Sequence, residues 1–143
     1  MSRKYVRENL EIVVKNAVEA VPALLEIRLF GGYHKGCHTK DNPDVDVMVL
    51  TADESFSGLN FLLRDEEKRE EITEYILTNT DYEFRRNQDL KLVSLFDMGI
   101  LIGRDEGRGD IGKAMYNGEL FYRRVPINPV KLSKYLWQRI SCK

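Results

Sequence analysis

The sequence has few of the residues that mark disulfide-rich or membrane-spanning proteins. Its 143 residues include two cysteines and two histidines. Cys37 and Cys142 are far apart along the chain, so we expect free, reduced thiols rather than a disulfide. No apolar run approaches the roughly 18 residues of a membrane span, and no signal-peptide core follows the first residues. These absences argue against a membrane protein and predict a cytoplasmic one.

Charge of one sign is also not in excess. The formal net charge is -1, which argues against nucleic-acid binding over the whole surface. The distribution is nevertheless uneven, because acidic residues crowd positions 65–74 and basic residues dominate positions 113–143. Two solvated helix faces are the simpler interpretation. The functional alternative is a basic wall in the C-terminal third for a triphosphate, an RNA or an acidic partner.

Hydrophobic periodicity predicts one α+β domain over residues 1–143, a mixed β-sheet with helices packed against it. Apolar residues recur at helical spacing from Val6 to Val21, and Pro22 discourages continuation of that helix. Residues 96–102 are ambiguous. The other expected elements are strands at 25–30, 44–50, 82–86, 90–95 and 119–123, a turn at 87–89, and helices beginning near Asp65 and at Asn128-Pro129.

The segment from residue 29 to residue 50 is the most informative part of the chain. A strand runs into Gly31-Gly32, a turn whose backbone can hold a phosphate, and Asp44 and Asp46 then open the next strand. Alternate strand residues share a face, so the two carboxylates should point the same way, about 6 to 7 Å apart along the strand. Such a pair can share a divalent cation. A phosphate turn beside a hard-metal site is what nucleotidyl transfer requires.

Each motif has an ordinary structural explanation as well, since a glycine pair is often only a turn and an acidic pair can be a solvated strand entrance. Their conjunction resembles the polymerase beta-like nucleotidyltransferases, most closely the minimal single-domain members. In that pattern Gly31 and Gly36 match the two glycines, and Asp44 and Asp46 match the metal-binding pair. Gly32 stands where the family usually has serine, so a phosphate-contacting hydroxyl is absent.

Members of this family generally carry a third carboxylate on a neighbouring strand. The best match for that strand is residues 90–93, and it places Lys91 where the acid belongs. Three explanations remain open. Glu83 can be the third acid if residues 82–86 form the strand beside Asp46, and we prefer it because a strand holds a side chain firmly. Asp89 is the second choice, and loss of catalysis is the third.

The resemblance implies a metal-dependent transfer of a nucleoside monophosphate from a triphosphate, ATP first among them, to an acceptor hydroxyl. Asp44 and Asp46 would hold Mg²⁺, Gly31 and Gly32 would seat the phosphates, and Lys35 would contact them. The alternative is a binding protein without strong catalysis, either an antitoxin-like partner of a toxin subunit or an RNA-binding accessory domain. The sequence does not identify the acceptor, the preferred base or the oligomeric state.

Overall fold

The computed structural model describes residues 2–30, 45–105 and 118–124, with only the backbone described for 101–105. The four strands are β1 (Leu24–Phe30), β2 (Val45–Thr51), β3 (Gln88–Ser94) and β4 (Glu119–Arg123). The helices are α1 (Arg3–Ala20), α3 (Glu66–Ile76), α4 (Tyr82–Asn87) and α5 (Leu95–Asp105), with a short 3-10 turn, η1 (Glu54–Phe56).

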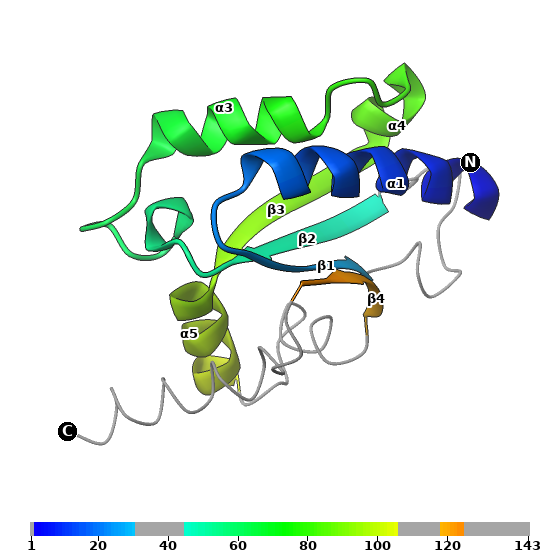
Figure 1. Cartoon of the computed structure of the whole chain (residues 1–143). Helices are drawn as coiled ribbons and strands as arrows, with labels where there is room; N and C mark the ends of the chain where they lie inside the picture. The colour runs from blue at the N-terminus through cyan, green and yellow to red at the C-terminus, as the bar shows by residue number, and fades with distance from the viewer. Residues whose placement is uncertain (1, 31–44, 106–117, 125–143) are drawn as a thin grey trace.

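The strands form one mixed sheet in the order β3-β2-β1-β4. β1 is antiparallel to β2 and to β4, whereas β2 and β3 are parallel. α1 and α3 lie on one side of the sheet and α5 lies on the other (Figure 1). The predicted α+β architecture is therefore confirmed, as are the strands expected at 25–30 and 119–123, which pair with each other at one side of the sheet.

The main core lies between the sheet and α1. The predicted first helix is confirmed: Ser2 caps its first turn by accepting a hydrogen bond from the Tyr5 N–H at 3.1 Å. α3 is confirmed in the same way, with Asp65 accepting from the Lys68 N–H at 3.1 Å. The apolar stripe of α1 packs on the odd-numbered valines of β2, and the cluster includes Val6, Leu10, Val13, Ala17, Val45, Val47 and Val49.

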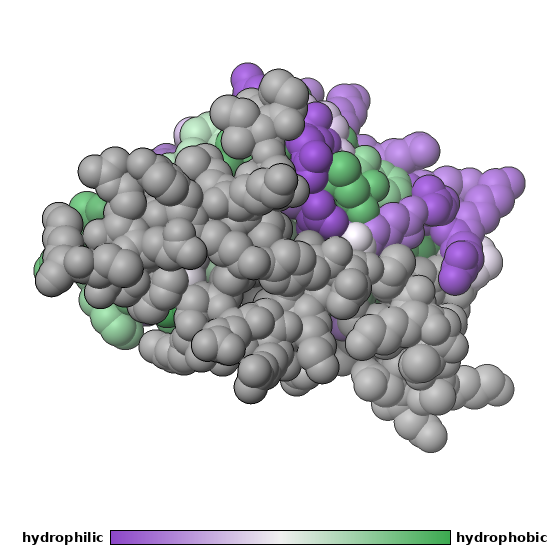
Figure 2. All heavy atoms as spheres, turned by 90° about the horizontal axis from the view of Figure 1, so that it is seen from below, coloured by the Kyte–Doolittle hydropathy of each residue, from purple (hydrophilic) through white to green (hydrophobic). Residues whose placement is uncertain are grey.

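The opposite face of the sheet has a smaller core. Met98 of α5 packs there against Phe30, Met48, Leu50 and Val93, so the ambiguous segment 96–102 is a helix. Figure 2 views the molecule from this side. Hydrophobic residues show at its left margin, where the loop after η1 projects in Figure 1, and mainly hydrophilic residues show at the right, where β2 begins.

One prediction about the elements is wrong. Residues 82–86 do not form a strand and 87–89 do not form a hairpin turn, because 82–87 form α4 and 88–94 form β3. Groups of α1 satisfy the free N–H groups where α4 begins: Asn9 Oδ1 accepts from the Asp81 N–H at 2.8 Å and Tyr5 Oη from the Phe84 N–H at 3.3 Å. Partners on α1 thus stabilise a helical turn that local alternation does not predict.

A further expectation, the helix at Asn128-Pro129, lies outside the described residues. Among the described residues, no helix has both the length and the apolar character needed to cross a membrane.

Candidate active site

The start of β2 carries the described member of the predicted acidic pair. Asp46 is the second residue of this strand and is half-buried. It lies opposite Phe30 on β1 and opposite Asp89 on β3. Asp44 lies outside the described residues, so its expected place on the same face as Asp46 stays a prediction.

The parallel pairing of β2 with β3 brings a second carboxylate to Asp46. Residues in register on neighbouring strands lie about 5 Å apart between Cα atoms and present their side chains to the same face. Asp46 and Asp89 are such a pair. Their face is the one on which Met48, Leu50 and Val93 form the smaller core. The face therefore changes along the strands from apolar under α5 to acidic at the end where β2 begins.

Lys91 lies next to this acidic pair, one same-face position further along β3. It is two residues after Asp89, so it shares the same face, and it lies opposite Met48. Its Nζ atom is 3.6 Å from Oδ2 of Asp89, and both side chains are about half-exposed. The positive charge that interrupts the family pattern is thus paired with the neighbouring acid rather than left alone beside Asp46.

Glu83 lies in a different setting from the one we expected. It is exposed in the first turn of α4, not held within a strand beside Asp46. The preference for Glu83 over Asp89 rested on a strand position, and the structure corrects that premise. Strand β3 presents Asp89 in its place, in register with Asp46.

A buried carboxylate on the same face was not anticipated. Glu26 is fully buried on β1, although it alternates with the apolar residues of that strand. It accepts hydrogen bonds from Nε of Arg28 and, at 3.0 Å, from Nε of Arg123 on β4. Arg28 also donates to the Gly118 carbonyl at 3.0 Å. Both Glu26 oxygens are thus neutralised by guanidinium groups, so this acid fastens the edge strand rather than offering a metal ligand. The only signal in the sequence was the alternation of Glu26 and Arg28 with apolar residues.

The residues predicted to hold phosphates, Gly31, Gly32 and Lys35, lie outside the described residues. Most of the basic C-terminal third lies outside them as well. Within the described part of the chain, no group of three acidic, histidine or cysteine side chains is placed to hold a metal ion.

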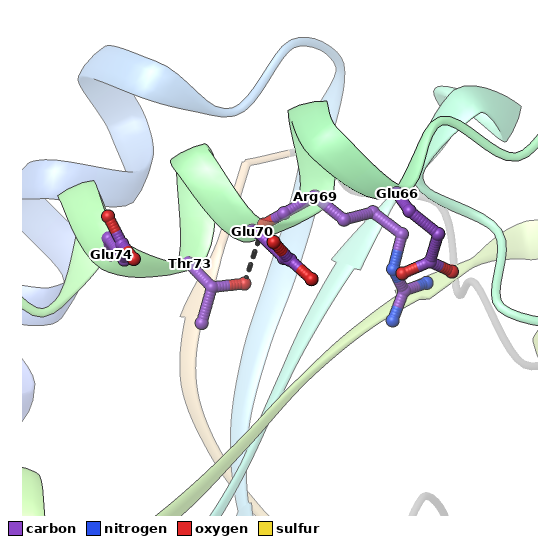
Figure 3. Close-up of a pocket in the computed structure, with 5 residues that line it drawn as sticks. All are labelled: Glu66, Arg69, Glu70, Thr73 and Glu74. Atoms are coloured by element: carbon purple, nitrogen blue, oxygen red, sulfur yellow. Dashed lines mark hydrogen bonds between the residues drawn. The ribbon is translucent and has the colours of Figure 1, made fainter.

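A surface hollow lies along α3 (Figure 3), and its lining residues are Glu66, Arg69, Glu70, Thr73 and Glu74. The Thr73 hydroxyl donates to the Arg69 carbonyl at 2.8 Å. All five side chains come from one helix, and that helix covers the face opposite Asp46. The hollow is therefore not part of the candidate site.

The chemistry of the donors fits Mg²⁺. Mg²⁺ binds hard oxygen ligands and usually takes one or two carboxylates from a protein. Asp46 and Asp89 supply two such groups from adjacent positions on a rigid sheet. On β3, the ammonium of Lys91 opposes a cation there.

A mixed sheet with an acidic residue near the start of a central strand is the arrangement that the resemblance to nucleotidyltransferases implies. The nucleotidyltransferase domain model matches residues 10–97, which is more than half of the chain. The chain therefore belongs to the nucleotidyltransferase domain family, and the resemblance seen in the sequence is confirmed. None of the curated proteins matches this sequence.

Solved structures support the same fold. One is a toxin-antitoxin with AMP-PNP, 20% identical, covering 94% of this chain and 90% of that chain at a TM-score of 0.55. Another is the tri-AMPylated Shewanella oneidensis HEPN toxin in complex with MNT antitoxin, 18% identical, covering 96% and 90% at 0.53. A third is a mutant MntA toxin-antitoxin complex, 18% identical, covering 94% and 90% at 0.53. At these identities the likeness shows the fold alone.

Proposed function

We propose that this protein is a metal-dependent nucleotidyltransferase that moves a nucleoside monophosphate from ATP or a related triphosphate to an acceptor hydroxyl. The acceptor oxygen forms a bond to the α-phosphorus, and the bond between that phosphorus and pyrophosphate breaks. The observation that carries the proposal is the register of Asp46 with Asp89, which puts two carboxylates side by side on one face of the sheet. The family match supports the reaction class.

The predicted residues other than Glu83 keep their roles in this proposal, and Asp89 takes the place of Glu83 as the third acid. Asp44, Asp46 and Asp89 would hold Mg²⁺, which supplies neutralisation of phosphate charge when bound. Asp89, whose side chain is about half-exposed, would also accept the proton of the attacking hydroxyl. Gly31 and Gly32 would present backbone N–H groups to the phosphates, with Lys35 beside them.

Four proteins test this assignment: wild type, Asp46→Asn, Asp89→Asn and Glu83→Gln. We expect Mg²⁺ with ATP to raise the melting temperature of the wild type, because only the folded state binds the ligand. Asp46→Asn should remove that shift. With a HEPN-type toxin from the same genome as acceptor, Asp89→Asn should slow transfer of labelled nucleotide by about a hundredfold or more, and Glu83→Gln should not.

Two results would contradict the assignment. An unchanged ligand shift in Asp46→Asn would show that this carboxylate is not a metal ligand. A rate loss in Glu83→Gln as large as that in Asp89→Asn would return the role of third acid to Glu83, the residue that the sequence analysis preferred.

The second candidate function is that of an antitoxin-like binding protein with weak or no catalysis. Gly32 and Lys91, which depart from the family pattern, favour this function. Residues 59–63, which we call the 59–63 loop, favour it as well, because four of the five are apolar. Three of its side chains are strongly exposed: Phe61 by 75%, Leu62 by 94% and Leu63 by 54%. Such a group of exposed apolar residues is typical of a protein-binding surface. A HEPN-type toxin, the partner in a similar structure, is the partner we propose. RNA binding through the C-terminal third stays a prediction.

A further inference from the structure

The position of Lys91 gives this site a property that the usual acidic triad lacks. In each row across this face of the sheet, residues of β3 and β2 lie side by side. Asp89 and Asp46 form one row, and Lys91 and Met48 form the next. Lys91 is thus the next residue after Asp89 on this face of β3, and its Nζ atom lies 3.6 Å from the Asp89 carboxylate.

This arrangement makes Lys91 a competitor of a bound metal. A divalent cation between Asp46 and Asp89 would face an ammonium group only a few ångströms away, and like charges at about 4 Å repel even in water. The same ammonium must also release Asp89 before that carboxylate can give its charge to a metal. Lys91 therefore lowers the affinity of the site for a metal that arrives alone.

The same side chain can favour a metal that arrives with phosphate. Lysine carries a compact charge on a flexible stem, and it is a common phosphate ligand. Lys91 is about half-exposed, so its head can move without leaving a core. Lys91 lies one same-face position along β3 from Asp89, an acid that would hold the metal of such a triphosphate.

We propose that Lys91 couples metal binding to nucleotide binding, which rests on the function proposed above. Without nucleotide, Lys91 pairs with Asp89 and keeps metal affinity low. With a metal-bound triphosphate, Lys91 leaves Asp89 and contacts phosphate oxygens. By linkage, the nucleotide then raises the affinity for metal by the same factor as the metal raises the affinity for nucleotide.

Substitution of Lys91 should separate this role from a structural one. An ion pair between exposed side chains contributes little to stability, so Lys91→Met should fold normally and melt near the wild-type temperature. Lys68→Met is the matched control. Lys68 pairs with Asp53 at 3.5 Å, but Asp53 lies beyond the other end of β2.

The measurements are the affinity for Mn²⁺ alone, by titration calorimetry, and the affinity for a non-hydrolysable ATP analogue in excess Mg²⁺. We expect Lys91→Met to bind Mn²⁺ alone about threefold to tenfold more tightly, and to bind the analogue about tenfold more weakly. Lys91→Arg, which keeps the charge, should resemble the wild type in Mn²⁺ affinity. Lys68→Met should change neither value.

Unchanged or weaker Mn²⁺ binding by Lys91→Met would overturn the proposal, and so would an unchanged affinity for the analogue. Either result leaves the proposed function standing if the wild type binds both ligands and Asp46→Asn does not. If the wild type binds neither ligand, the proposed function fails together with this inference.

Discussion

Glu54, in the 3-10 turn η1 after β2, is a half-buried acid, and only one of its two carboxylate oxygens accepts a hydrogen bond from the described backbone. Its Oε1 accepts a hydrogen bond from the Phe96 N–H at 3.1 Å. Its Oε2 is buried and accepts no hydrogen bond within the part of the chain that the structure describes. Burial raises the pKa of this carboxyl, against the opposing influence of the Ser94 side chain and the Phe96 N–H, and the nearby charges of Asp97 and Asp53 raise it further. The folded state therefore favours the protonated form.

This raised pKa predicts a stability change with a definite sign. The pKa of Glu54 in the folded state lies above the ordinary value of 4.5. The contribution of Glu54 to the free energy of unfolding is therefore most favourable below pH 4.5, and it is lost as the pH rises through the raised pKa. Glu54→Gln removes the charge, so we expect it to raise the melting temperature at pH 7 and to have a smaller effect at pH 4. Thermal denaturation at a series of pH values measures this. Glu71→Gln, on the exposed face of α3, is the control, and a lower melting temperature of Glu54→Gln at pH 7 would contradict the argument.

At the scale of elements, α4 shows how one buried side chain distinguishes a helix from a strand. In a strand, Tyr82 and Phe84 would lie on the same face and be buried together. In the structure Phe84 is fully buried in the main core, whereas Tyr82 is 71% exposed. This asymmetry follows from the helical turn, which directs only Phe84 at the sheet and α1.

Truncation of these two aromatic residues tests the assignment of α4. Phe84→Ala should lower the free energy of unfolding by about 3 to 5 kcal/mol, because it leaves a cavity in a closed core. Tyr82→Ala should cost much less, since its ring is mostly in water. Urea denaturation measures both values. Losses of similar size would indicate that residues 82–86 are a strand with both rings buried.

β3 illustrates the same dependence on neighbours. Its second half is buried on both faces, with Leu92 in the main core and Val93 beneath α5, whereas Asp89 and Lys91 in its first half are exposed. The strand is at the edge of the sheet, and α5 covers only the end from which it departs. The polar half of β3 is thus left on the surface, where it can take part in binding.

For the whole molecule, the candidate site and the 59–63 loop lie at opposite ends of the sheet (Figure 1). The seven residues of β2 span about 20 Å. Asp46 is near the start of this strand, and the turn that leads to the loop follows its end. Asp97 of α5 holds the base of the loop by accepting from the Gly58 N–H at 2.8 Å and the Leu59 N–H at 3.1 Å. A partner on this loop would leave the acidic end accessible.

This separation predicts independent loss of the two proposed activities. Leu62→Asp should weaken binding of a HEPN-type toxin from the same genome by about tenfold or more, as for a central apolar anchor. It should leave the shift in melting temperature with Mg²⁺ and ATP unchanged. Val18→Asp, at another exposed apolar position on α1, is the matched control for toxin binding. Equal binding by wild type and Leu62→Asp would exclude the loop as the contact surface.

Local pattern was sufficient for several parts of this protein. The helical spacing from Val6 to Val21 predicted α1, and strand alternation puts Val45, Val47 and Val49 on one face of β2, the face that the structure packs in the main core. These patterns succeed because burial of an apolar face is a repeated, short-range constraint on the chain. The same short-range reasoning identified the acidic pair and the family resemblance. The family match confirms the resemblance.

The tertiary structure decided which acid stands beside Asp46. Glu83 and Asp89 both follow α3 closely in the sequence, and only the contacts of α1 with α4 and the register of β3 against β2 separate them. It also decided that Glu26 is buried between two arginines and that Lys91 is paired with Asp89. Strand register and ion pairing depend on residues far apart along the chain, so no local pattern could specify them.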